Sequence, residues 1–446
     1  MFSAFFSATP RLRVQGVWNF GLKMLDFRFQ FEWEDSPRVR APELDATWAR
    51  LEIYAHDEPI TKVEAKRAQS VRTGIYVPLY PIAEWIVANW WFLWDEWRTD
   101  GRDARHSLPS AREGFVLPDV SFHPTETKME VVWHAGASGS SAGILFLSSG
   151  SSVLAKSSVR EEFRRLVDTV IERLNVRQVH GSYLVQERQA IQDAERDPEQ
   201  RAFCEKAARL GCDPFDIDDS IATQIEHIGV VLPEPMVEDF CDAIPLAQMV
   251  SGADEIRAFL DSAAATASKE GRWRELRNGL GWQGTGIPWR DGYNDARALR
   301  SSLGLSAAIA SDLDSLHQEL GSFEIQECAV PSRIDAISAP TQTGAPLFGY
   351  RPHLSEKSKR FILCRALSDH LASGQPSLVT RSGTEHQQRN RAFAAEFLAP
   401  TESIRERIGG DRVGEEDIEE LAQEFQVSDL VIRHQIQNHK LAWLGA

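Results

Sequence analysis

The chain of 446 residues has few cysteines, no long apolar run and fewer basic than acidic residues. Its five cysteines are scattered and odd in number, and no two have the spacing of a zinc motif. This argues against a disulfide framework and is typical of reduced thiols in a cytoplasmic protein. No stretch of about 18 apolar residues occurs, so we expect no membrane span. The net charge of −16 disfavours nucleic acid and anionic membranes as partners.

The length predicts two to three domains, and 42% hydrophobic with 26% charged residues is ordinary for a globular protein. We predict a multidomain α+β chain in three parts. Residues 1–175 form an α+β domain of unknown type with a tryptophan-rich helix, and residues 176–320 form a helical middle region. Residues 321–446 form a mostly helical C-terminal domain.

Apolar residues alternate at Phe27, Phe29, Phe31 and Trp33, which predicts a half-buried strand. Comparable patterns predict four further strands, and a closing helix is expected at 159–174. The strands are expected at 49–55, 71–77, 130–133 and 144–147.

Residues 81–97 hold five of the 13 tryptophans and begin with a proline suited to a first helical turn. We predict one helix here, with two interpretations. It is either a core helix or, through Trp90, Trp94 and Trp97, an exposed contact surface for a protein assembly.

Three patterns resemble functional motifs but have the wrong context. Ser141 lies in a G-x-S-x-G pattern that is followed by a predicted strand, whereas a nucleophile elbow requires a helix there. The G-x-G-x-x-G pattern at 279–284 follows a helix instead of a strand. Four aspartates at 213–219 miss the calcium-loop spacing, so we expect Asp218 or Asp219 to cap a helix at 221–228.

The most informative segments lie near the C-terminus, at 360–371 (R-F-I-L-C-R-A-L-S-D-H-L) and 388–400 (Q-R-N-R-A-F-A-A-E-F-L-A-P). Together they resemble the two core helices of the ImmA/IrrE family, which are zinc metallopeptidase-like proteins. That family typically has R-F-x-x-A-H-E-x-x-H on the first helix and A-N-x-F-A-A-E-L-L-x-P on the second. The resemblance implies a zincin-like C-terminal domain.

The resemblance assigns the family's histidine, glutamate and second histidine to Arg365, Ala366 and Asp369. A guanidinium offers no lone pair to zinc, and an alanine cannot act as general base. The peptidase site is therefore degenerate, and we predict no catalytic residue, no metal and no cofactor. Arg365 and Asp369 stand one helical turn apart, so we expect them to form an ion pair. Arg365→Ala should then destabilise the domain by exposing Asp369 as an uncompensated carboxylate.

The family's third ligand is a glutamate on the second helix, near which Gln387 and Gln388 stand here. An unusual metallopeptidase site could still draw on nearby carboxylates and imidazoles, namely Asp369, His370, Glu385 and His386. As binding residues of a retained substrate groove we propose five positions, Arg365, Asp369, His370, Glu385 and Arg391.

Two short helices are expected at 418–428 and 431–439, with Ser428 as N-cap of the second. Their pattern is similar to a helix-turn-helix. Residues 401–446, however, carry ten acidic and five basic residues, and DNA binding requires the opposite sign. We therefore expect a packing pair of helices.

The leading hypothesis is a non-catalytic binding or regulatory protein whose partner is another protein. The resemblance implies a bacterial setting in a stress or anti-phage response. The alternatives are a metallopeptidase with the unusual ligands named above and a structural subunit of an assembly. The oligomeric state stays open.

Overall fold

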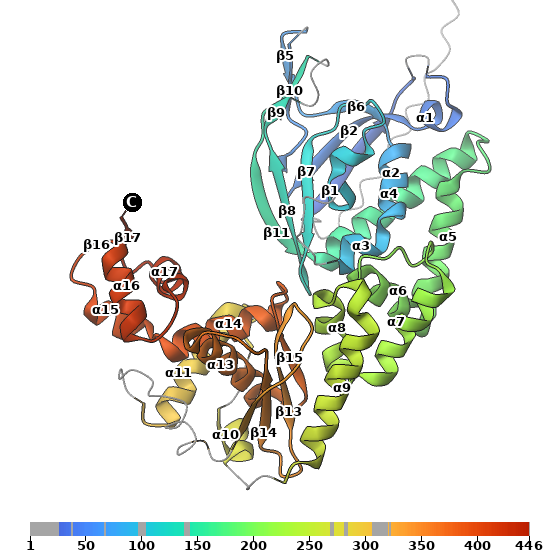
Figure 1. The fold of residues 1–446 in the computed structure, drawn as a ribbon. Coiled ribbons are helices and arrows are strands. Elements are labelled where there is room, and N and C mark those ends of the chain that lie inside the picture. The colour runs from blue at the N-terminus through green and yellow to red at the C-terminus, as the bar shows by residue number, and fades with distance from the viewer. Residues whose placement is uncertain are drawn as a thin grey trace, which may run out of the picture.

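The computed structural model describes residues 26–36, 39–66, 68–96, 104–137, 143–267, 272–280, 284–305, 320 and 323–445. The protein is a multidomain α+β molecule, as predicted. Figure 1 shows an N-terminal sheet region, a set of middle helices and a C-terminal region in which helices pack on a smaller sheet. Among the described residues no helix has both the length and the apolar character to cross a membrane.

Antiparallel strands build the N-terminal region. The first sheet joins β1 (Phe27–Trp33), β2 (Trp48–Ala55), β3 (Glu58–Pro59) and β6 (Ile75–Pro78). A second sheet has the order β5-β4-β10-β9, and a third the order β11-β8-β7. Their bounds are β4 Val63–Ala65, β5 Ser70–Arg72, β7 Asp119–Pro124, β8 Lys128–His134, β9 Gly136–Ala137, β10 Ile144–Phe146 and β11 Gly150–Ala155.

The alternation of aromatic residues in β1 has the predicted result. Phe27 and Phe29 are buried, and Phe31 and Trp33 are partly covered at the edge of the same core. The predicted strand at 71–77 is interrupted and forms β5 and β6, which belong to different sheets. The first and third sheets pack on α4 (Lys156–Val176), the helix expected to close this region.

The tryptophan-rich segment is two helices instead of one, α2 (Tyr80–Ala88) and α3 (Trp90–Asp95). Asn89 separates them, and its side-chain amide donates to the carbonyl of Trp85 at 2.8 Å. An asparagine that bonds its own preceding turn competes with helix continuation. Trp90 and Trp94 are buried, so they offer no contact surface; Trp97 lies outside the described residues.

The middle helices connect two hydrophobic cores. Two of them, α5 (Tyr183–Arg196) and α6 (Pro198–Arg209), contribute to the N-terminal core. Three more form the next core together with C-terminal strands: α7 (Asp219–Val231), α8 (Glu234–Ala243) and α9 (Met249–Ala265). Asp218 caps α7 by accepting from the amide of Ile221 at 3.0 Å, as predicted.

A four-stranded sheet of order β12-β14-β13-β15 lies at the centre of the C-terminal region. Its bounds are β12 Glu324–Glu327, β13 Ile334–Pro340, β14 Pro346–Tyr350 and β15 Ser377–Thr380. Helices α8 and α9 contact β15 and β13, and α13 (Glu356–Ser373) contacts β13, β14 and β15. None of these strands was predicted, because β13 and β14 are buried along nearly their whole length and show no alternation.

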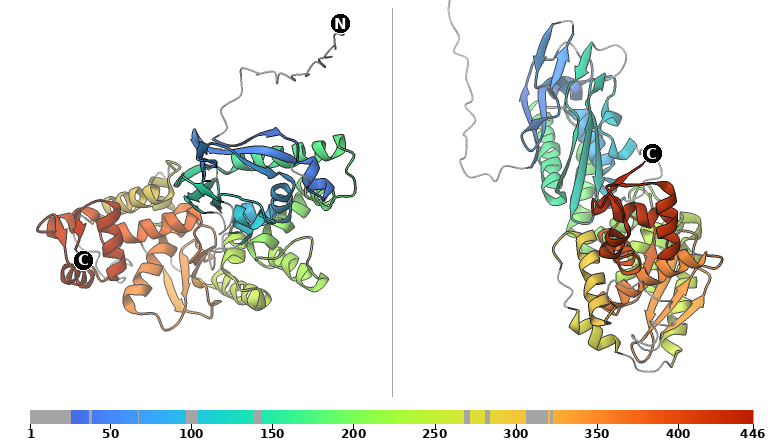
Figure 2. Two further views of the ribbon diagram at one scale, coloured as in Figure 1. Left: turned by 90° about the horizontal axis from the view of Figure 1, so that it is seen from above. Right: turned by 90° about the vertical axis from the view of Figure 1, so that its left-hand side faces the viewer.

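Helices complete the C-terminal region (Figure 2). They are α10 (Trp273–Gly279), α11 (Pro288–Ser302), α14 (Glu385–Leu398), α15 (Thr401–Arg407), α16 (Glu415–Glu424) and α17 (Asp429–Asn438). A small parallel ladder joins β16 (Arg412–Val413) to β17 (Trp443–Leu444). Of the glycine pattern at 279–284, Gly279 ends α10, and Gly281 lies outside the described residues, as does Ser141.

Candidate functional site

Helix α13 presents the positions that the resemblance assigns to the zinc site. Ser355 begins the helix by accepting from the amide of Ser358, and Gly374 ends it in the left-handed conformation. Every residue from Ile362 to Leu371 is buried, so both Arg365 and Asp369 lie in the interior. Helix α14 lies beside α13, and Thr384 caps it by accepting from the amide of Gln387.

Arg365 is held by partners from a strand and from α14, not from its own helix. Its Nη2 donates to the carbonyl of Thr380 and to Oε1 of Gln387, both at 2.6 Å. Its Nη1 is 3.9 Å from Oδ2 of Asp335. Burial lowers the pKa of Arg365 to about 10, with a smaller contribution from nearby Arg391. The group is therefore a buried cation at neutral pH.

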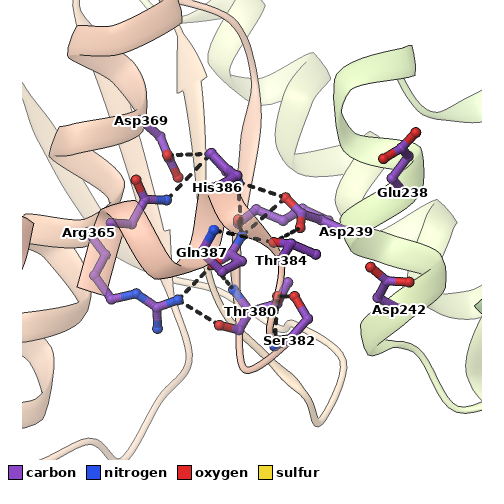
Figure 3. A network of polar contacts seen from close by, with 12 residues as sticks. Glu238, Asp239, Asp242, Arg365, Asp369, Thr380, Ser382, Thr384, His386 and Gln387 are labelled. Atoms are coloured by element: carbon purple, nitrogen blue, oxygen red, sulfur yellow. Dashed lines mark hydrogen bonds and ion pairs between the residues drawn. The ribbon is translucent and has the colours of Figure 1, made fainter. Parts of the chain in front are cut away.

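Asp369 pairs with His386 of α14, whose Nε2 contacts its Oδ1. The other ring nitrogen of His386, Nδ1, is 3.1 Å from Oδ2 of Asp239 in α8. Burial alone would lower the pKa of His386, but the two carboxylates together raise it well above its usual value. His386 is thus a protonated bridge between two carboxylates (Figure 3).

The predicted ion pair between Arg365 and Asp369 is wrong. Both side chains are described, and each is directed to a different residue of α14, as Figure 3 shows. Two neighbouring side chains of α14, His386 and Gln387, reach α13 and contact Asp369 and Arg365 in place of that pair. Loss of Arg365 would therefore leave the carbonyl of Thr380 without this donor, instead of leaving Asp369 without a partner.

Gln387 is the centre of the polar network. Its Oε1 accepts from Arg365 and from the amide of Thr380, and its Nε2 donates to the carbonyl of Leu378 and to Asp239. Its side chain is fully buried, and all four contacts fall within hydrogen-bonding distance. The network therefore joins α13, α14 and β15 to helix α8 of the middle region.

Two of the predicted binding residues lie elsewhere. His370 is buried against the rings of Trp273 and Phe348, and burial, with a smaller effect of Arg277, lowers its pKa to about 3. Glu385 accepts a hydrogen bond from Thr127 of the N-terminal region at 2.7 Å. The unusual ligand set of Asp369, His370, Glu385 and His386 is thus not gathered at one point. Among the described residues no three His, Cys, Asp or Glu are placed to hold a metal ion.

The residues present do not fit a zinc ion. Zinc requires neutral imidazoles, thiolates or carboxylates around one point. Here a guanidinium stands at a position that the resemblance assigns to a ligand, and the nearby imidazole is protonated and bonded through both nitrogens.

Arg365 and Arg391 line a cleft of about 530 Å³. Helices α11, α13, α14 and α17 form its walls, and residues at the ends of the central strands form its base. Arg391 donates to the carbonyl of Ser382 at 2.9 Å. The structure therefore brings these two predicted residues to one surface and separates them from His370 and Glu385.

The helix pair at the C-terminus forms as predicted and packs inward. Ser428 occupies the N-cap position of α17, but its side chain makes no capping bond. Gln435 of α17 is buried and donates to Glu396 and to the carbonyl of Ala399. Glu396, from the A-A-E segment, also accepts from Arg297 of α11. This packing holds α17 in the position where it forms one wall of the cleft.

Three residues of the site could not be recognised from the sequence. Asp239 lies in α8, more than 100 residues before α13, and Asp335 and Arg381 lie in and directly after strands that lack alternation. Gln387 was noted only as a departure from the family pattern. Its role could have been suspected because it stands near the position that the resemblance assigns to the third ligand.

Comparison with protein families gives one result for the C-terminal part. Residues 331–437 match the model of the IrrE N-terminal-like domain, which confirms the resemblance for that segment. Comparisons with curated proteins and with solved structures gave no significant match.

Proposed function

We propose that this chain is a non-catalytic regulatory protein in which an IrrE-like domain binds a ligand instead of cleaving a substrate. One observation carries the proposal. The positions for two zinc ligands and a general base hold Arg365, Ala366 and Asp369, and the charged pair is engaged by Gln387 and His386.

The contacts that Arg365 and Asp369 make with α14 support a structural role for these two positions. A buried cation with hydrogen bonds to a carbonyl and an amide oxygen is fixed in place. Opening it to admit a metal would expose buried polar groups, each of which costs about 1–3 kcal/mol when unpaired. The adjoining cleft stays open while the former ligand positions are filled.

The context and partner follow from resemblance alone. We place the protein in a bacterial stress or anti-phage response, with another protein as the target that it regulates. The network through Asp239 offers a physical link by which events in the cleft could reach the middle helices.

Metal analysis of the purified full chain tests the proposal. We expect clearly substoichiometric zinc by inductively coupled plasma mass spectrometry and no hydrolysis of an unfolded protein substrate. Asp369→Asn removes the remaining carboxylate at a former ligand position, and Asp411→Asn is the control at an exposed site. One zinc per chain that is lost in Asp369→Asn and kept in Asp411→Asn would overturn the proposal.

A further inference from the structure

The cleft beside α13 has a charge opposite to that of the chain. Its described lining residues include five cations and one carboxylate, Asp335. The cations are Arg351, Lys357, Arg365, Arg381 and Arg391. The chain as a whole carries a net charge of −16. A concentration of positive charge in a concave site focuses the field and favours an anionic ligand.

One carboxylate serves three guanidinium groups. Oδ1 of Asp335 is 2.9 Å from Arg351 and 3.4 Å from Arg381, and Oδ2 is 3.9 Å from Arg365. The strand ends explain this convergence: Asp335 lies in β13, whereas Arg351 and Arg381 directly follow β14 and β15. At least two positive charges of this cluster therefore remain without a carboxylate.

Arg365 at the base of the cleft is 4% exposed, and its Nε has no hydrogen-bond partner among the described residues. A buried cation that is incompletely paired is destabilising, and an anion held beside it offsets that cost. Guanidinium groups bind phosphate oxygens in pairs of parallel hydrogen bonds. A dianionic phosphate matches the surplus of this cluster better than a single carboxylate does.

Other residues that line the cleft are aromatic or apolar. Trp289 of α11 lines it and is 46% exposed, and its ring lies 6.0 Å from that of Tyr293. Phe361 and Leu430 line the same space, and Leu430 is also exposed. An exposed indole beside apolar side chains is a suitable platform for a flat ring.

We propose that this cleft binds a nucleoside phosphate, with the phosphate among Arg365, Arg381 and Arg391 and the base on Trp289. This deepens the proposed function, because it names the ligand class of the same binding domain. The volume of about 530 Å³ falls within the usual range of small-molecule sites. The partial exposure of Trp289 and Arg381 leaves both groups accessible to a ligand.

Isothermal titration of the full chain tests this assignment with AMP, ADP, GMP and UMP. Adenosine and inorganic phosphate are the partial probes, and a glutamate-rich peptide is the competitor class. We expect the nucleotides to bind, adenosine and phosphate to bind much more weakly, and the affinity to fall with salt. Tighter binding of the peptide than of any nucleotide, or no nucleotide binding by folded protein, would overturn the proposal.

Surface variants locate the site without disturbing the core. Arg381→Ala should weaken nucleotide binding about tenfold, as loss of a charge-assisted hydrogen bond does. Trp289→Ala should weaken it about fivefold or more through lost stacking. The matched controls are Arg257→Ala and Trp443→Ala, which change exposed residues outside this cleft and should leave affinity unchanged.

Two results separate this inference from the proposed function. If Trp289→Ala and Arg381→Ala both bind nucleotide as strongly as the natural chain does, the ligand binds elsewhere and the assignment is overturned. A metal-free, inactive protein that binds no nucleotide would overturn only the ligand class, whereas stoichiometric zinc would overturn the non-catalytic function itself.

Discussion

At the residue scale, Arg365 and Asp369 each contact a different residue of α14 instead of each other. The sequence placed both residues one turn apart on one helix, because the motif that they resemble has a fixed spacing. It could not predict their partners, because Gln387 and His386 belong to another helix and Asp239 to another region. The i,i+4 spacing on a helix favoured an ion pair between Arg365 and Asp369. In the structure, contacts with other elements take the place of that pair.

The charge state of His386 gives a pH-dependent stability. Its pKa is raised well above the value of about 6.5 for an unfolded chain. The folded state therefore binds one more proton between those two values. The stabilisation is fully present below about pH 6.5 and is lost as pH rises through the folded pKa. One proton gives a slope of at most about 1.4 kcal/mol per pH unit.

Urea unfolding from pH 5.5 to 9, compared between the natural chain and His386→Ala, measures this contribution. The difference in unfolding free energy should shrink as pH rises, because the variant lacks the bridge. The comparison cancels groups that titrate alike in both proteins. The carboxylates facing the ring, Asp369 and Asp239, and Glu126 nearby are present in both. A difference that is constant over this range would contradict a protonated bridge.

At the element scale, strands with a regular alternation of large apolar residues were the easiest to predict. β1 and β2 alternate and were found, but β13 and β14 are buried on both faces and were not. Helix α11 shows a second limit. Its close packing on α14 depends on a small residue, Gly292, which a sequence search for motifs passes over.

Gly292→Ala should destabilise the protein even though alanine favours helices. A Cβ at Gly292 would overlap the carbonyl oxygen of Arg389 and lie 2.9 Å from the amide nitrogen of Phe393. Backbone cannot move aside as a side chain can, so overpacking should cost about 1–3 kcal/mol. That outweighs the gain of up to about 1 kcal/mol in helix propensity. Thermal and urea unfolding would measure the difference.

Gly279→Ala is the matched control, because Gly279 ends α10 and, among the described residues, no atom lies within 4 Å of a Cβ there. This change should be neutral or stabilise the protein by about 0.4–1 kcal/mol. Equal effects of the two substitutions would mean that the contact between α11 and α14 does not restrict the size of the side chain at position 292.

At the scale of the whole molecule, the regions share cores. Helices α5 and α6 join the N-terminal core, and α7, α8 and α9 share a core with β13 to β15. Composition predicted a multidomain α+β chain, but it carries no information on which helix packs on which sheet. The net charge of −16 likewise concealed a basic cleft, because a sum over the chain does not describe a local surface.

The junction between the middle helices and the C-terminal domain should depend on Asp239. This carboxylate is 6% exposed and accepts from His386, Gln387 and Thr384. Asp239→Ala removes three contacts between α8 and α14 and leaves a cation without one of its two carboxylates. We expect a loss of about 1–3 kcal/mol in stability. Hydrogen exchange should also accelerate at the start of α14, in β15 and in α8.

Asp254→Ala is the matched control, because Asp254 lies on the neighbouring helix α9 and its side chain is 62% exposed. It should leave exchange in α14 and β15 unchanged. Faster exchange confined to α8 in Asp239→Ala would mean that α8 loosens alone and that the network does not hold the two regions together. Faster exchange on both sides, absent in the control, would identify Asp239 as a residue that holds α14 and β15 to α8.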